Sequence, residues 1–180
     1  MIMAPFRIFT ALASLMALSA CFYSEVPLIP PGEQVTLPYD GVVLCLADDC
    51  RNVMVGGDGA YEIPPPPDEA DEKPLQVRFQ ALMTNVNNPV YLAEVEMRDD
   101  EAVSFHYLVA HIREGAATHV PTYEFAMPAC NDADEDTQRE SSFERVDAYS
   151  CRVKDLAAFK DYLIAEHGAD FGTEAFWTED

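Results

Sequence analysis

The chain has 180 residues, 49% of them hydrophobic, and its 11 Lys and Arg against 32 Asp and Glu give a formal net charge of −21. This charge excludes most nucleic-acid binding and electrostatic binding to anionic lipids, because both require a basic surface. The length fits one domain, and the hydrophobic fraction is too high for a fully disordered chain.

Residues 1–20 have the pattern of an export signal. Met1–Arg7 carries one positive charge, and Ile8–Ala20 is an apolar run too short to span a bilayer. The run ends in Leu18-Ser19-Ala20-Cys21, which resembles the lipobox of bacterial lipoproteins. The resemblance implies that the signal peptide is cut before Cys21 and that the Cys21 thiol receives a diacylglyceryl group. The alternative is an ordinary secretory signal with a cysteine near its cleavage site.

Cleavage before Cys21 would remove one charged residue, Arg7, and leave a charge of −22 on 160 residues. Two or more acyl chains anchor a protein stably to a bilayer. Phe22 follows Cys21, whereas enterobacterial lipoproteins retained at the inner membrane carry an aspartate there. We therefore expect a periplasm-facing protein attached to the lipid bilayer through acylated Cys21, with the outer membrane favoured over the inner.

Residues 21–38 are rich in proline, which favours extended chain. The prolines are Pro27, Pro30, Pro31 and Pro38. We predict that this segment is a tether between the lipid and the domain. The alternative is an N-terminal arm packed on the domain, because several of its residues are apolar. These are Phe22, Tyr23, Leu28 and Ile29.

Residues 39–180 are expected to form a single β-rich domain. Its first strands are expected at Gly41–Ala47, Asn52–Val55 and Ala60–Ile63. Gly56–Gly59 indicates a hairpin turn, because glycine adopts the positive φ that such turns need. Residues 64–74 are expected to be an acidic, proline-rich connector, since proline lacks the strand-pairing N–H and the carboxylates repel one another.

A second group of strands shows alternation of apolar and polar residues. It is expected at Leu75–Met83, Val90–Arg98, Val103–Ile112 and Thr118–Met127. The strand Val103–Ile112 is apolar on both faces, which is typical of a central strand. Pro121 in the last strand predicts an edge position or a bulge. Regular spacing and short turns predict an antiparallel β-meander, arranged as a sandwich or half-barrel.

The acidic segment Cys130–Ala148 is expected to be a solvated loop, and the one clear helix is expected at Asp155–His167. Asp155 suits the amino-terminal end of the helix dipole, and Gly168 is a typical helix stop. The expected buried stripe consists of Leu156, Phe159, Leu163 and Ile164. The fold class is therefore α+β, a meander with one C-terminal α-helix. The tail aromatics expected to pack on the sheet are Phe171, Phe176 and Trp177.

Four cysteines remain after Cys21, and an even number in an exported chain indicates disulfides. Of three possible connectivities, we favour Cys45–Cys50 and Cys130–Cys151, each of which closes a local loop. A zinc site is the alternative for Cys45 and Cys50, but no histidine stands near either cysteine in the sequence.

Three aspartates, Asp132, Asp134 and Asp136, are the calcium candidates, because alternate carboxylates begin an EF-hand loop. The match then fails, since Thr137 stands where the loop needs glycine and Phe143 where it needs glutamate. A solvated acidic loop is the main interpretation, and no metal site is assigned.

The histidines give no clear site either. His106 and His111 are five residues apart on one expected strand, so their side chains should point to opposite faces. His119 could meet one of them across a hairpin, and His167 lies on the expected helix. Motifs for a serine nucleophile are absent from the sequence, so no catalytic residue and no cofactor are assigned.

Acidity is the remaining functional signal, because a field of this sign attracts basic partners and weakens with salt. We expect a non-enzymatic accessory or protein-binding module on a bacterial membrane, with a basic protein as its possible partner. One alternative is a small-ligand or calcium-binding lipoprotein. Another is an inhibitor of a basic envelope enzyme, by analogy with envelope lysozyme inhibitors.

Overall fold

The computed structural model describes residues 21–37, 41–46, 49–65, 73–84, 88–98, 102–112, 122–130 and 135–178. The expected signal peptide lies outside these ranges, as do His119, Pro121, Asp132 and Asp134. The middle of the expected connector, residues 66–72, also lies outside them.

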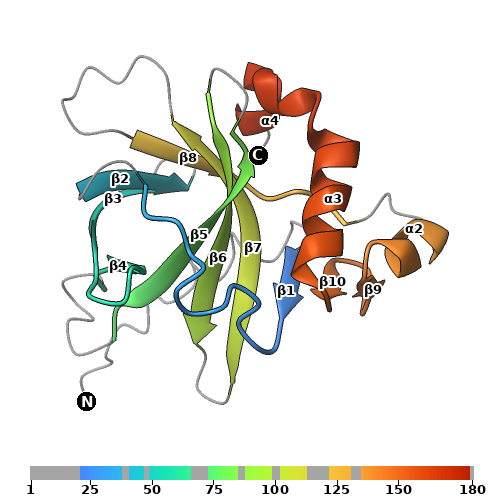
Figure 1. The fold of residues 1–180 in the computed structure, drawn as a ribbon, viewed down its shortest axis with the longest axis horizontal. Coiled ribbons are helices and arrows are strands. Elements are labelled where there is room, and N and C mark those ends of the chain that lie inside the picture. Colours follow the sequence, from blue (N-terminus) through green and yellow to red (C-terminus); the bar gives the residue numbers. More distant parts are fainter. Residues whose placement is uncertain are drawn as a thin grey trace, which may run out of the picture.

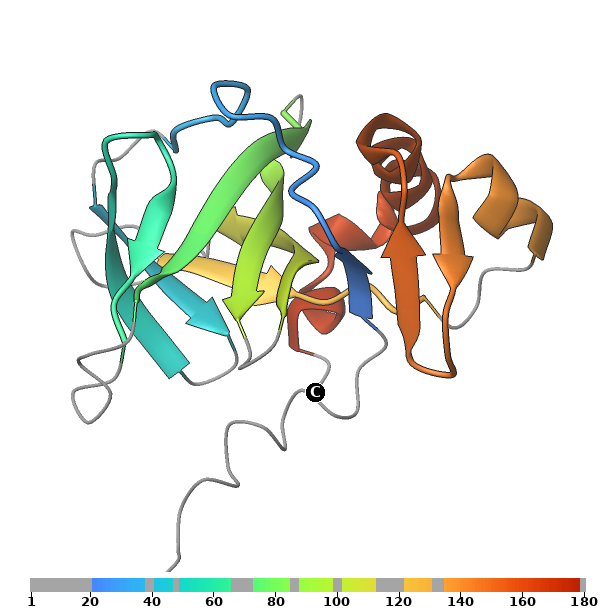
Figure 2. The same cartoon turned by 90° about the horizontal axis from the view of Figure 1, so that it is seen from below.

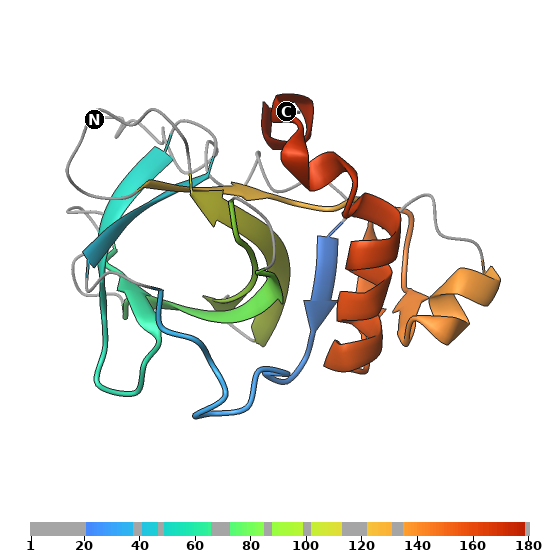
Figure 3. The same cartoon turned by 45° about the horizontal axis from the view of Figure 1, so that its top comes forward.

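Within the described ranges, seven strands close into a mixed β-barrel, which Figure 3 shows as a ring. The strands are β2 (Gly41–Leu46), β3 (Asp49–Val55), β4 (Tyr61–Ile63), β5 (Leu75–Met83), β6 (Val90–Arg98), β7 (Val103–Ile112) and β8 (Thr122–Ala126). Each strand pairs antiparallel with the next along the chain. The ring closes where β8 pairs parallel with β2, with Thr122 opposite Val43.

The predicted antiparallel meander is confirmed, but the sandwich or half-barrel arrangement is wrong. Because β8 reaches β2, the meander has no open edge between its first and last strands. For the same reason β8 is an interior strand, so the edge position predicted from Pro121 is wrong, while the alternative of a bulge concerns a residue outside the described ranges. The central position predicted for β7 is confirmed, since β6, β8 and β1 (Cys21–Ser24) all pair with it.

An outer layer covers one side of the barrel (Figures 1 and 2). Its sheet continues from β7 through β1 and β10 (Ser150–Val153) to β9 (Phe143–Arg145). Its helical elements are α2 (Glu135–Glu140), α3 (Leu156–His167), the short 3₁₀ helix η2 (Asp170–Gly172) and α4 (Glu174–Thr178). The segment Cys130–Ala148, predicted to be a loop, thus contains a helix and a strand. Strand β9 forms there because it buries Phe143, which is 3% exposed.

The tether predicted at residues 21–38 is wrong, and the alternative of a packed arm holds. Phe22 and Ile29 are fully buried and Leu37 is 2% exposed. The backbone N–H of Val35 also donates to the carbonyl of Phe79 at 2.8 Å. Apolar side chains between the prolines therefore bind this segment, called the N-terminal arm (residues 25–37) below, across the barrel wall.

Helix α3 begins and ends where the sequence predicts. The Asp155 carboxylate accepts the backbone N–H of Ala158 at 2.8 Å and caps the first turn. Phe159 and Leu163 are fully buried as predicted. Ile164, which was expected to be buried, is exposed, and Tyr162 is buried in its place. The buried stripe is therefore rotated from the predicted one.

Two hydrophobic cores lie on either side of the barrel wall. Strand β7 separates them, since Leu108 and Ala110 point into the barrel while Tyr107 and Val109 point into the outer layer. The largest fully buried residues inside the barrel are Tyr61, Phe79 and Tyr123. The outer core is built mainly by Phe22, Leu92, Phe143, Phe159 and Leu163.

Candidate functional site

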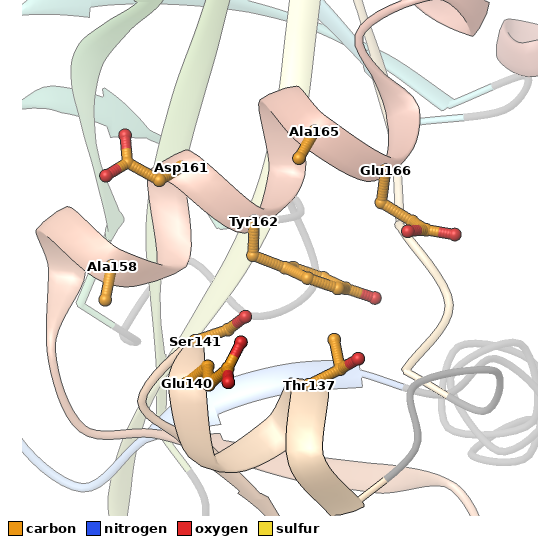
Figure 4. A pocket seen from close by; sticks show the side chains of 8 residues that line it. All are labelled: Thr137, Glu140, Ser141, Ala158, Asp161, Tyr162, Ala165 and Glu166. Atoms are coloured by element: carbon orange, nitrogen blue, oxygen red, sulfur yellow. The ribbon is translucent and has the colours of Figure 1, made fainter.

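A pocket of about 320 Å³ opens between α2 and α3 (Figure 4). Three acidic residues line it, Glu140 on α2 and Asp161 and Glu166 on α3, and the carboxylate of Asp161 points away from the gap between the helices. The ring of Tyr162 lies between the two helices, and Ser141 adds a hydroxyl group. None of the described residues that line the pocket is basic. Acidic residues beside an aromatic ring favour a cation with an apolar stem, so the pocket suits a lysine or arginine side chain or an organic ammonium group.

Glu94 on β6 forms a second polar cluster, buried under the N-terminal arm. Its Oε2 atom accepts the backbone N–H groups of Leu28 at 2.6 Å and Ile29 at 2.9 Å. It also accepts the hydroxyl of Tyr107 at 3.1 Å. Nη1 of Arg78 lies 3.6 Å from Oε1 and supplies a positive charge. A buried carboxylate needs such partners, and this one uses them to hold the arm on the barrel.

The phenol hydroxyl of Tyr107 in this cluster stays protonated. Burial raises the pKa of Tyr107 far above its ordinary value, and the nearby Glu94 carboxylate raises this pKa further. The hydroxyls of Tyr107 and Ser24 are 2.7 Å apart, which ties β1 to the same cluster. Tyr107 is thus a permanent hydrogen-bond donor, and the cluster fixes the arm rather than exchanging protons.

The alternation of apolar and polar residues along β6 does not reveal the role of Glu94, because Glu94 shares its face of the strand with the charged residues Glu96 and Arg98. It is in fact 1% exposed, because the N-terminal arm covers that face. Nothing local in the sequence signals this burial.

The calcium prediction finds no support in the part of the site that is described. Asp136 lies in the first turn of α2, and its carboxylate pairs with the guanidinium of Arg139 on the same helix. Asp132 and Asp134 are outside the described residues. Among the residues that are described, no group of three or more His, Cys, Asp or Glu is placed to hold a metal ion.

The prediction that His106 and His111 face apart is confirmed by the unbroken register of β7. The ring of His111 stacks on Trp177 with centroids 3.6 Å apart, and its Nδ1 lies 3.0 Å from the Asn88 amide. On the other face, Nε2 of His106 lies 3.1 Å from the Ser104 hydroxyl.

Burial lowers the pKa of His106. The contact of His111 with Trp177 confirms that the aromatic tail packs on the sheet, and Phe171 is 5% exposed there. His167 lies at the end of α3, with its ring centroid 5.9 Å from that of Phe176.

The cysteines lie as the sequence predicts where the structure describes them. Cys130 and Cys151 form a disulfide with their Cα atoms 6.0 Å apart. Cys45 and Cys50 lie opposite each other in the β2–β3 pair, which is the register their predicted bridge needs. The Cys45 side chain is outside the description, so that bridge stays a prediction. Cys21 is the first residue of β1 and lies opposite Ser150 on β10.

These features define a small closed β-barrel domain with a disulfide-linked outer layer and an acidic pocket between two helices. Comparison with protein-family models, with curated proteins and with solved structures finds no match. In the described part of the chain, no helix is long and apolar enough to cross a membrane. The residues of this chain and their arrangement are therefore the basis for a functional proposal.

Proposed function

We propose that the protein is a lipid-anchored bacterial envelope protein that acts as a non-enzymatic accessory or protein-binding module. One observation carries the proposal: Leu18-Ser19-Ala20-Cys21 has the lipobox pattern, and Cys21, where the lipobox predicts that the mature chain starts, is the first residue of strand β1. The cleavage point that the lipobox predicts and the beginning of β1 thus coincide at Cys21. The Cys130–Cys151 disulfide fits the oxidising compartment that such a leader leads to.

The pocket between α2 and α3 supports a binding role. Its lining gathers Glu140, Asp161 and Glu166 on a chain that already carries a large negative charge. Such a surface attracts a basic protein over a distance, and the pocket accepts one of its cationic side chains. An inhibitor of a basic envelope enzyme is the second candidate, because the same pocket would receive a basic residue of the enzyme.

Lipid attachment is tested by the mass of the mature protein and by the C21A variant. We expect acyl chains on Cys21 in the protein isolated from its own membranes, and we expect C21A to leave the membrane fraction. A C21A protein that is still processed and membrane-bound would refute the anchor. The outer-membrane prediction is checked by separating the two membranes and measuring in which of them the acylated protein lies.

The binding role is tested by affinity capture from the native membranes at low salt and at about 0.5 M salt, where the Debye length falls to roughly 4 Å. The triple variant E140Q/D161N/E166Q removes the pocket charges. The matched control E62Q/E135Q/E174Q removes three exposed charges elsewhere. We expect a stoichiometric basic partner that is lost with high salt and with the pocket variant but retained by the control. Equal loss in both variants would refute the pocket as the binding site.

A further inference from the structure

The turn between β9 and β10 exposes two large apolar side chains. Val146 is 49% exposed and Tyr149 is 56% exposed. Backbone hydrogen bonds order the turn, since the N–H of Val146 donates to the carbonyl of Ser150 at 2.9 Å. The N–H of Tyr149 donates to the Asp147 carboxylate at 2.7 Å. The turn therefore presents both side chains to the surroundings in a fixed arrangement.

This turn lies beside the predicted site of lipid attachment. Strands β1 and β10 are parallel, and Cys21 is opposite Ser150, so Tyr149 precedes the partner of Cys21 by one residue. Figure 2 shows the beginning of β1 and the β9–β10 turn toward the same side of the outer layer. One residue spans at most about 3.6 Å of chain, so acyl chains on Cys21 would enter the bilayer close to this turn.

The residues directly after Cys21 are part of the folded domain, so no flexible linker there would let the domain move away from the membrane. Phe22 is fully buried, and its ring packs against Phe143 at 5.0 Å and Phe159 at 4.7 Å between centroids. Phe22 and Tyr23 are paired on both sides, with β7 and with β10. Because the first residue after the anchor belongs to the core, the anchor fixes which side of the domain meets the lipid.

We propose that Val146 and Tyr149 contact the lipid bilayer that holds the Cys21 acyl chains and so orient the domain on the membrane. This inference rests on the proposed function, because it requires acylation of Cys21. Tyrosine is enriched at membrane interfaces, where its ring lies among the acyl chains and its hydroxyl remains hydrated.

The charges around the turn determine how deeply the turn enters the bilayer and which lipid headgroups it contacts. Glu144 pairs with Arg152 and Lys154, which lower the pKa of its carboxyl group, and Arg152 also pairs with Glu25 at 2.7 Å. These four groups therefore compensate one another. Asp147 is an exposed carboxylate within the turn, so the turn rests at headgroup level. The acidic net charge opposes anionic lipid, and the surface that fits is zwitterionic.

The test uses acylated, full-length mature protein in phosphatidylcholine vesicles with or without brominated acyl chains, which quench nearby tryptophan. The variant Y149W reports the turn, and M54W is the matched control, because Met54 is also an exposed apolar residue, at 71%. It lies on β3, on the far side of the barrel from β10 (Figures 1 and 2). Both carry W177F, which removes the native tryptophan signal and keeps a ring against His111.

We expect brominated lipid to quench Y149W several-fold more than M54W. Equal quenching of the two, or no quenching of Y149W in acylated protein, would overturn the docking surface. Acyl chains missing from Cys21 would overturn the proposed function instead, so mass spectrometry is run on the same samples.

A second measurement avoids the tryptophan substitutions. Amide hydrogen exchange at residues 147–149 is compared between the wild-type protein on vesicles and the C21A protein in solution. We expect slower exchange on vesicles in this turn and unchanged exchange in the β3–β4 turn at residues 56–59. Unchanged exchange in both turns would contradict the docking.

Discussion

The interior core of the barrel and the outer core are both rich in aromatic residues, but the chain assembles them differently. Inside the barrel, Phe79 packs against Tyr61 with centroids 5.4 Å apart, and these residues come from strands that are neighbours in sequence. In the outer core, Phe159 packs against Phe22, from the other end of the described chain. Most of the interior core thus comes from strands that are neighbours in the chain, with one distant contact where β8 closes on β2, whereas the outer core exists only when both ends of the described chain have come together.

The largest expected effect is on the cores themselves, through F79A inside the barrel and F159A outside it. Both side chains are fully buried, so each variant should lose about 3–5 kcal/mol of unfolding free energy. Because β7 carries residues of both cores, we expect one cooperative transition in each variant. Denaturant titration followed by far-ultraviolet circular dichroism and by Trp177 fluorescence checks this. Two separated transitions would show that the cores unfold independently.

The disulfide links the chain after β8 to strand β10. Removal of the Cys130–Cys151 bridge in C130S/C151S should cost about 3 kcal/mol, because the unfolded chain gains the freedom of the opened loop. Because the two cores are expected to unfold together, we expect the thermal unfolding midpoint to fall and amide exchange to become faster in β2–β5 as well as in the outer layer. Unchanged exchange in β2–β5 would show that the bridge stabilises the outer layer alone.

The connection between the two regions is tested by E94Q. Glutamine removes the negative charge that the N–H groups of Leu28 and Ile29 and the guanidinium of Arg78 share, so we expect a loss of about 2 kcal/mol. The control E96Q removes the partner of Arg98 in a pair that is more exposed, and it should cost below about 1 kcal/mol. Denaturant titration compares the two variants. Faster amide exchange in the arm of E94Q would place the loss there, and equal costs would contradict the clamp.

The smallest expected effect depends on pH. Burial holds the pKa of His106 below its ordinary 6.5, so the unfolded chain binds a proton at a higher pH than the folded one. Stability should therefore fall as the pH drops below 6.5 and level off once the pH passes the folded pKa. The H106N variant should lose this part of the pH dependence in thermal melts between pH 7 and pH 5. An unchanged profile in H106N would assign the dependence to other groups.

The sequence predicts those parts of the fold whose partners lie close in the chain. Alternation locates β5, β6 and β7 to the residue, and the Asp155 cap locates the start of α3. The closure of β8 on β2 has no local signal, because it joins segments about eighty residues apart. The prolines of residues 21–38 led to the wrong prediction of a tether. Proline indicates a stiff, extended backbone, but it does not indicate whether Phe22 and Ile29 are buried.

The candidate sites divide in the same way. The Cys130–Cys151 bridge could be predicted from cysteine count and spacing. The buried carboxylate of Glu94 and the pocket between α2 and α3 could not, because both depend on elements that approach only in three dimensions. The acidic composition predicts a basic partner, but it does not predict which acidic residues lie together at the pocket.

The parallel pairing of β1 with β10 has a consequence for the order in which the chain folds. Cys21 lies opposite Ser150, so β1 can complete its pairing only after the chain is available as far as β10. Contacts between residues so distant in sequence form late, because loop closure must precede them. Under the proposed acylation of Cys21, this late pairing would leave its thiol accessible to a modifying enzyme until β10 has docked.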